Sequence, residues 1–328
     1  MICHAERPLN HTKESANVKR HSVSMMLFAG AVALVTSSLL FLPVPATATV
    51  PVRTFHFTNY RVPHALQTWL TGINDAGTIV GWFFDQQDNT HGFALSHDRL
   101  TQIDDPSGTN TQVFGINSSG AVVGAYVTSC LEEICSEGFV YHGGRFTDVG
   151  PPTYRNLDDP DDAPDSVANA INDLGDVVGF GGDGFGSAFG FIKRDHKYET
   201  VKVPGANDSI IVGINKTGLA TVNWATNTTF QASLYDGSQL TTIDVPGAKE
   251  SFAGGISDNG DIVLSWGSVE GGYLHGALLA RGLYFRFNDP SGRNDTIPLA
   301  VNDYRTIVGA YSPGGTHDIH VFGFIATY

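Results

Sequence analysis

The chain has 328 residues, of which 41% are hydrophobic and 16% are charged. Its formal net charge is −14 at pH 7, so the composition excludes a protein that binds the phosphate backbone of a nucleic acid. The three cysteines supply too few sulfur ligands, at their spacing, for a structural zinc site.

The first 48 residues resemble a leader. Lys19 and Arg20 precede an apolar run, which is followed by the small-residue sequence Ala46-Thr47-Ala48. This order predicts a secretory signal peptide over residues 1–48 and an exported domain over 49–328. The apolar run is also long enough to span a bilayer, so a retained membrane anchor is the alternative. We expect a secreted or periplasmic bacterial protein that is monomeric and has no membrane partner once the leader is cleaved.

The exported part begins with a short strand pattern over residues 54–63 and continues as a repeat. The repeat is centred on a Gly-Ile-Asn tripeptide or a close variant of it. Its copies are Gly72-Ile73-Asn74, Gly115-Ile116-Asn117, Ala170-Ile171-Asn172, Gly213-Ile214-Asn215, Gly255-Ile256-Ser257 and Ala300-Val301-Asn302. A glycine follows three residues later in five copies, whereas Arg305 takes that place in the last. This pattern predicts a strand, a tight turn that needs positive φ, and a second strand.

Each copy continues with two further strand patterns. The third strand is centred on pairs such as Gly92-Phe93, and the fourth ends at a proline such as Pro106 or Pro246. Four short antiparallel strands in each unit of roughly 45 residues are typical of a propeller blade. The sequence therefore predicts an all-β fold, a six-bladed β-propeller with four-stranded antiparallel blades.

The two ends of the chain are complementary. The last unit stops after its third strand, over residues 321–328, while residues 54–63 supply a fourth strand without a unit of its own. We therefore expect the N-terminal strand to pair in the last blade and close the ring, which removes exposed sheet edges. An open β-solenoid, with units stacked in a line, is the structural alternative.

The run Gly-Ile-Asn-x-x-Gly-x-Ile-Val-Gly at residues 72–81, with His91-Gly92-Phe93 after it, resembles the HAF family of probable extracellular repeat proteins. The resemblance covers about residues 54–328. Val222 and Leu264 depart from it, because they replace the later glycine of the motif in units four and five. The resemblance implies an extracellular setting, and it supplies no catalytic or ligand residues.

A small hydroxyl stands four residues before each Gly-Ile-Asn motif. The six residues are Thr68, Thr111, Ser166, Ser209, Ser251 and Thr296. In a closed propeller they would ring the channel mouth on the rim that carries the loops between strands 4 and 1 and between strands 2 and 3. One interpretation is a polar collar for a ligand, and the other is a side-chain bond that caps each turn. The second is favoured, because a feature of every unit indicates architecture.

Unit two departs from the repeat through two long loops on that same rim. The first, residues 127–137, contains Cys130 and Cys135, which we expect to form a disulfide in an oxidising compartment. The second, residues 151–165, is strongly acidic, and unit three adds Asp183 in a glycine-rich loop. The candidate ligand-binding residues are Tyr154, Arg155, Asp158, Asp159, Asp161, Asp162, Asp165 and Asp183.

These loops predict an acidic lip for a cation, a sugar or a basic peptide. Calcium is the cofactor that so many carboxylates suggest, and a solvated acidic loop is the simpler interpretation.

Six nearly equivalent units without a differentiated acid–base pair favour a non-enzymatic binding or scaffold module for a carbohydrate, a peptide or a cell-surface protein. The alternative is a secreted propeller hydrolase or lyase with an acidic site at the channel mouth. A lectin with a shallow site between every pair of blades is a third hypothesis.

Overall fold

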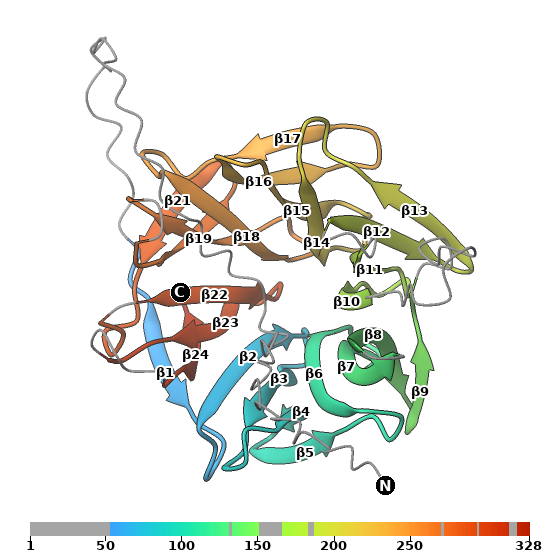
Figure 1. Cartoon of the computed structure of the whole chain (residues 1–328). Coiled ribbons are helices and arrows are strands. Elements are labelled where there is room, and N and C mark those ends of the chain that lie inside the picture. The colour runs from blue at the N-terminus through green and yellow to red at the C-terminus, as the bar shows by residue number, and fades with distance from the viewer. Residues whose placement is uncertain are drawn as a thin grey trace, which may run out of the picture. The chain divides into compact units, whose positions relative to one another are not determined.

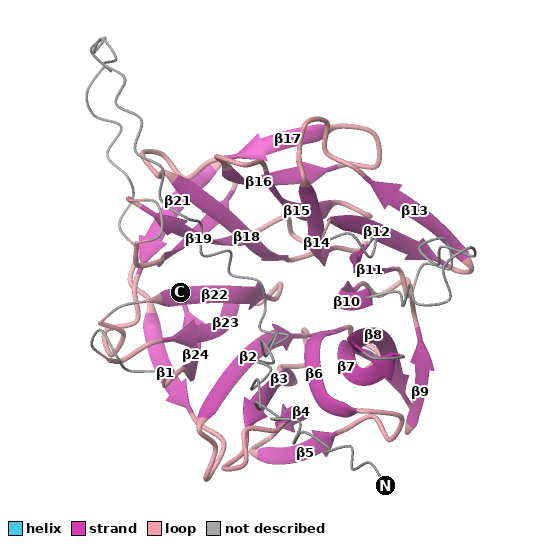
Figure 2. Ribbon diagram, viewed as in Figure 1, coloured by secondary structure: helices cyan, strands magenta, loops and turns pink. Residues whose placement is uncertain are grey.

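The structure is a computed structural model that describes residues 53–130, 133–150, 166–182, 187–269, 272–293, 295–314 and 320–328. These residues form 24 strands and no helix. The strands pair into six four-stranded antiparallel sheets, which surround a common axis as the blades of a propeller (Figure 1). In Figure 2 the described residues are strands, loops and turns. The predicted six-bladed propeller is therefore confirmed.

Three blades come from the first half of the chain. Blade 1 consists of β2 (Gln67–Ile73), β3 (Ile79–Phe84), β4 (Thr90–Ser96) and β5 (Arg99–Ile103). Blade 2 consists of β6 (Thr109–Ile116), β7 (Val122–Cys130), β8 (Glu133–His142) and β9 (Arg145–Asp148). Blade 3 consists of β10 (Ser166–Ile171), β11 (Val177–Gly182), β12 (Ala188–Arg194) and β13 (Lys197–Val201).

The other three blades complete the ring. Blade 4 consists of β14 (Asp208–Ile214), β15 (Ala220–Ala225), β16 (Phe230–Tyr235) and β17 (Leu240–Ile243). Blade 5 consists of β18 (Glu250–Ile256), β19 (Ile262–Gly267), β20 (His275–Ala280) and β21 (Leu283–Phe287). Blade 6 consists of β22 (Thr296–Val301), β23 (Thr306–Tyr311), β24 (Phe322–Thr327) and β1 (His56–Tyr60).

The ring closes as expected, because β1 is the outer strand of blade 6. It pairs antiparallel with β24 in a register that runs from His56 opposite Thr327 to Tyr60 opposite Gly323. Aromatic packing reinforces this pairing, since the ring of Phe57 lies 5.7 Å from that of Phe324 between centroids. Residues from the two ends of the chain thus build one blade.

Inside each blade, a large side chain on one of the two middle strands lies opposite a small residue on the other. In blade 1, Phe93 lies directly opposite Gly81 and is fully buried. In blade 5 the sizes are exchanged, because Leu264 lies opposite Ala277. The same exchange places Val222 opposite Ser233 in blade 4. The departures of units four and five from the glycine motif therefore conserve volume in the core.

Neighbouring first strands come very close at the axis. A Cβ atom added to Gly72 would lie 3.1 Å from the Cα atom of Gly115 in the next blade, and one added to Gly115 would lie 3.0 Å from the Cα atom of Ala170. Every first strand also shifts its register just before or within the Gly-Ile-Asn motif, and β6 has a second shift between Thr109 and Gln112. The small first residue of the motif thus permits a narrow channel.

Among the residues that the structure describes, no helix has the length and apolar character to cross a bilayer. The expected signal peptide, residues 1–48, lies outside them.

Candidate functional site

The axis of the propeller ends in a pocket on the rim that carries the turns between strands 1 and 2. We call this pocket the axial mouth. It has a volume of about 80 Å³, enough for several water molecules. Its lining comes from the ends of first strands and the turns after them. These residues are Ile73, Asn74, Asp75, Ile116, Asn117, Ser118, Ile171, Asn172, Asp173, Ile214, Ile256, Ser257, Asp258, Val301, Asn302 and Asp303.

The asparagine of the Gly-Ile-Asn motif joins neighbouring blades. The side-chain amide of each donates to the main-chain carbonyl of the equivalent residue in the next blade, and we call these residues the clasp asparagines. The pairs are Asn74 with Asn117, Asn117 with Asn172, Asn172 with Asn215, Asn215 with Ser257, and Asn302 with Asn74, at 3.0–3.3 Å. Ser257 has no amide to donate, so the ring has one gap, between blades 5 and 6.

Each clasp asparagine also organises its own turn. In blade 2 the side-chain oxygen of Asn117 accepts the N–H groups of Ser119 and Ala121, at 3.1 and 2.9 Å. The clasp asparagines are 4–7% exposed, so an amide that donates forward and accepts locally leaves little of its polar surface unpaired. This dual use explains why the motif keeps asparagine in five units of six.

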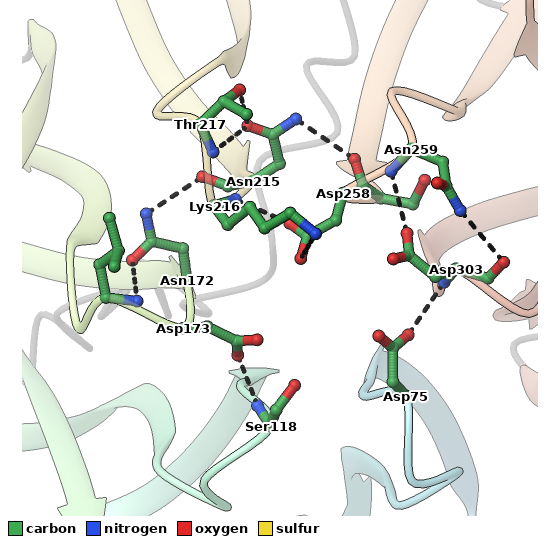
Figure 3. Close-up of polar contacts among 12 residues, drawn as sticks. Asp75, Ser118, Asn172, Asp173, Asn215, Lys216, Thr217, Asp258, Asn259 and Asp303 are labelled. Carbon is green, nitrogen blue, oxygen red and sulfur yellow. Dashed lines mark hydrogen bonds and ion pairs between the residues drawn. The ribbon is translucent and has the colours of Figure 1, made fainter.

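Aspartates follow the clasp position in four blades, and we call Asp75, Asp173, Asp258 and Asp303 the axial aspartates. One oxygen of each accepts a backbone N–H from the preceding blade. For example, the N–H of Asp303 donates to Oδ1 of Asp75 at 3.0 Å, and that of Ser118 donates to Oδ1 of Asp173 at 2.8 Å. Figure 3 shows these contacts between adjacent turns. The carboxylates are therefore held in fixed positions around the axis.

A lysine neutralises one of these carboxylates. Nζ of Lys216 lies 3.3 Å from Oδ2 of Asp258. This carboxylate raises the pKa of Lys216 by hydrogen bonding and by charge, with smaller contributions from the charges of Asp303 and Asp75. The second oxygens of Asp75, Asp173 and Asp303 have no hydrogen-bond partner among the described residues. The axial mouth thus keeps an unbalanced negative charge.

The floor of the axial mouth is apolar. One residue before the clasp position, each first strand contributes a β-branched side chain, isoleucine in five blades and Val301 in blade 6. Because the first strands run toward this rim, these side chains lie deeper in the channel than the asparagines. A cation held by the carboxylates therefore lies at the opening of the axial mouth, above the apolar floor.

No model of a known protein family matches the chain, and no curated protein sequence matches it. Solved structures do resemble it. AofleA from Arthrobotrys oligospora has a TM-score of 0.51 at 11% identity, over 83% of this chain and 86% of that chain. Virginiamycin B lyase from Staphylococcus aureus has a TM-score of 0.45 at 13% identity, over 84% of this chain and 100% of that one.

A fucose-specific lectin from Aleuria aurantia has a TM-score of 0.42 at 13% identity, over 67% of this chain and 76% of that chain. At such low identity, the likeness to AofleA is one of fold alone.

The six predicted hydroxyls lie inside the blades. Their residues are 0–4% exposed, and each hydroxyl oxygen accepts a backbone N–H at 2.9–3.4 Å. The donors to Thr68, Thr111, Ser166, Ser209, Ser251 and Thr296 are Val62, Asp105, Gly138, Gly190, Val245 and Asp289. In four blades the donor lies six or seven residues earlier, as in a turn bond, whereas the donors to Ser166 and Ser209 lie on the third strand of the preceding blade. A polar collar open to a ligand would require exposed hydroxyls.

The predicted acidic lip falls outside the described residues. This applies to Tyr154, Arg155, Asp158, Asp159, Asp161, Asp162, Asp165 and Asp183, so the lip and its calcium stay predictions. The described residues contain no group of three or more His, Cys, Asp or Glu side chains arranged to hold a metal ion. Cys135 is disulfide-bonded, but the side chain of Cys130 is not among those described, so the expected pairing stays a prediction as well.

Described residues at the base of the unit-two loops form a polar cluster around Tyr126. Burial raises the pKa of Tyr126 well above its usual range, and the carboxylates of Asp148, Glu137 and Asp105 raise it further. Its hydroxyl donates to Asp148 at 3.4 Å. Asp105 is 3% exposed, and its Oδ2 atom has no hydrogen-bond partner. Blade 6 repeats the arrangement with the buried Asp289.

The sequence predicts a site on the opposite rim, which stays a prediction, and it did not single out the axial aspartates. The signal was present, because the position after the clasp residue is aspartate in four units of six. Asn-Asp dipeptides before a turn glycine are ordinary turn sequences, so they suggested local structure only. The closed ring is what gathers the four carboxylates around one pocket.

Proposed function

We propose that the protein is an exported, non-catalytic binding module of the HAF type, and that its axial mouth binds a positively charged group of a peptide partner. The observation that carries this proposal is the set of second oxygens of Asp75, Asp173 and Asp303, which surround an apolar floor without a partner among the described residues. Carboxylates fixed in this way are prepared to accept the N–H groups of an ammonium or a guanidinium ion.

The size of the axial mouth is compatible with a charged head group. About 80 Å³ accommodates an ammonium with part of its stem. The net charge of −14 supports the same ligand class, because a strongly acidic protein attracts cationic partners over long range. A neutral carbohydrate would gain nothing from that field.

The axial aspartates also favour binding over catalysis. An acid–base mechanism with two carboxylates needs environments that hold them in different protonation states. Here one oxygen of each of the four accepts a backbone N–H from a neighbouring blade, and among them only Asp258 also pairs with a lysine. Equivalent acceptors form a recognition surface more readily than a reaction centre.

An NMR titration with n-butylammonium tests the proposal, with n-butanol and methyl glycosides as neutral comparisons. We expect millimolar affinity for the cation, a weakening of about two- to fivefold in Asp303→Asn, and a gain of similar size in Lys216→Gln, which frees the carboxylate of Asp258. The gain in affinity expected for Lys216→Gln is the more informative result, because damage to the fold would only weaken binding.

Asp98→Asn is the matched control, because it removes one charge from an exposed turn at the outer edge of the same rim. We expect it to leave the affinity unchanged. Equal affinity for n-butanol, preferential binding of a glycoside, or no response to Lys216→Gln would contradict the proposal.

A further inference from the structure

Two large apolar side chains are exposed beside the axial mouth. Leu174 is 74% exposed and Tyr304 is 75% exposed. Each directly follows an axial aspartate, Asp173 in blade 3 and Asp303 in blade 6. Both therefore stand on the rim into which the axial mouth opens.

The two side chains lie on opposite sides of the axis. Blades 3 and 6 are three positions apart in a ring of six, so the turns after β10 and β22 face each other across the channel (Figure 1). The axial mouth lies between them, because both turns contribute lining residues. A single extended segment that crosses the axis would pass over Leu174, the axial mouth and Tyr304 in turn.

The turn geometry does not require these side chains. The equivalent positions in the other four blades hold Ala76, Ser119, Thr217 and Asn259, which are small or polar, although all six turns make the same hydrogen bond from their last residue back to the clasp position. Single exposed apolar residues are common on protein surfaces. Two that flank an acidic pocket on opposite sides offer apolar surface that a partner bound in the pocket could remove from water.

We propose that the axial mouth, Leu174 and Tyr304 form one docking surface for an extended segment of a partner protein, in which a lysine or arginine has an apolar residue on either side. This inference rests on the proposed function, since the cation occupies the axial mouth. The apolar residues of the segment cover Leu174 and Tyr304 and remove their surface from water.

The charge of the axial mouth argues for a peptide and against two other occupants. A membrane surface rich in anionic lipids would be repelled by the axial aspartates. A second copy of this chain would bring the same excess of acidic residues. A basic segment complements both the charge of the axial mouth and the apolar side chains beside it.

The test uses synthetic peptides in which a central lysine is separated from a leucine on each side by one to four glycines. Matched peptides carry serine in place of leucine. We expect the best leucine peptide to bind the protein about tenfold more tightly than its serine counterpart, as measured by isothermal titration calorimetry. In the double variant Leu174→Ser and Tyr304→Ser, we expect this advantage to disappear while the affinity for n-butylammonium stays unchanged.

Leu283→Ser is the control, because Leu283 is an exposed apolar residue (49%) at the outer edge of the same rim, on β21. It should leave the advantage of the leucine peptides intact. A persistent advantage in the double variant, or none in the original protein, would overturn the docking surface while leaving the cation site in place. A protein that binds no n-butylammonium would overturn both proposals, and binding to anionic vesicles in preference to the peptides would overturn the choice of partner.

Discussion

The side-chain amide of Asn302 donates to the main-chain carbonyl of Asn74 at 3.1 Å, although 228 positions separate the two residues. This contact joins the last blade to the first at the axis, while the pairing of β1 with β24 joins the ends of the chain at the outer edge of blade 6. The ring is therefore closed both at the axis and at the outer edge of blade 6. The inner closure depends on one residue type, which allows it to be tested by substitution.

Replacing a clasp asparagine should destabilise the propeller, and filling the gap in the ring should stabilise it. Asn302→Ala removes the bond to Asn74 and the bonds to its own turn, so we expect the free energy of unfolding to fall by about 2–3 kcal/mol. Ser257→Asn supplies the missing amide, and we expect a gain of about 0.5–1 kcal/mol. Urea unfolding followed by tryptophan fluorescence measures both. A loss of stability in Ser257→Asn would show that the ring of amides is not a source of stability.

The turn position with positive φ should prefer glycine in every blade. Gly77 has φ +77°, and an added Cβ would meet nothing within 4 Å, so Gly77→Ala isolates the cost of the backbone conformation. We expect a loss of about 1 kcal/mol. Arg305 occupies the equivalent turn with φ +63°, and Arg305→Gly should therefore gain up to about 1 kcal/mol. Thermal unfolding of the two variants checks the opposite signs, and equal signs would contradict this explanation.

His91 should give the protein a stability that falls at alkaline pH. Burial alone would lower the pKa of His91, but hydrogen bonds to Asp104 (2.9 Å) and Asp85 (3.3 Å) and the charges of both carboxylates outweigh it, and the pKa is raised. A raised pKa stabilises the folded state fully below the unfolded value of about 6.5, and this contribution is lost as the pH rises through the folded value.

The His91 prediction has two readouts. The NMR titration of the imidazole should give a midpoint above that of a model peptide and should move down in Asp104→Asn. The difference in unfolding free energy between the original protein and His91→Gln should shrink between pH 6 and pH 9. A difference that grows over this interval would mean that the folded state favours the neutral ring.

The buried aspartates of blades 2 and 6 should lower stability relative to valine. Asp105 occupies the position that holds the buried valines Val62, Val149 and Val245 in three other blades, and one of its oxygens has no hydrogen-bond partner. We expect Asp105→Val to raise the free energy of unfolding by about 1 kcal/mol. The reverse change, Val245→Asp, should lower it by about 2 kcal/mol or more. If Asp105→Val instead destabilises the protein, the bond from the N–H of Ser107 to Asp105 is the stronger effect.

The fold was predictable from the sequence because each blade repeats its own turn chemistry. Gly77, three residues after Asn74, indicates a turn that needs positive φ. The strand pattern before Val62 has no unit of its own and therefore indicates closure of the ring. The exchange of large and small residues at Leu264 and Ala277 was not predictable, since it depends on which positions of two strands face each other. In the sequence the exchange looks like a departure from the motif, but it conserves the combined side-chain volume of the two positions.

The candidate site was less predictable, for a physical reason. Asp75 and Asp303 are far apart in the sequence, and each stands in an ordinary turn. Only closure of the ring makes them neighbours, with the N–H of Asp303 bound to Asp75. The role of the hydroxyl at Thr68 was easier to predict. Its recurrence in every unit indicated a shared structural role, and the structure places it in a buried turn bond.

A map of backbone amide shifts on addition of n-butylammonium tests the central claim most directly. The account predicts that the largest shifts fall on the turns after the first strands, at Asp75, Asp173 and Asp303, and that Lys216→Gln enlarges them at a given concentration. Shifts confined to the opposite rim, at the base of the unit-two loops around Tyr126, would contradict it and would place the cation site where the acidic lip was expected.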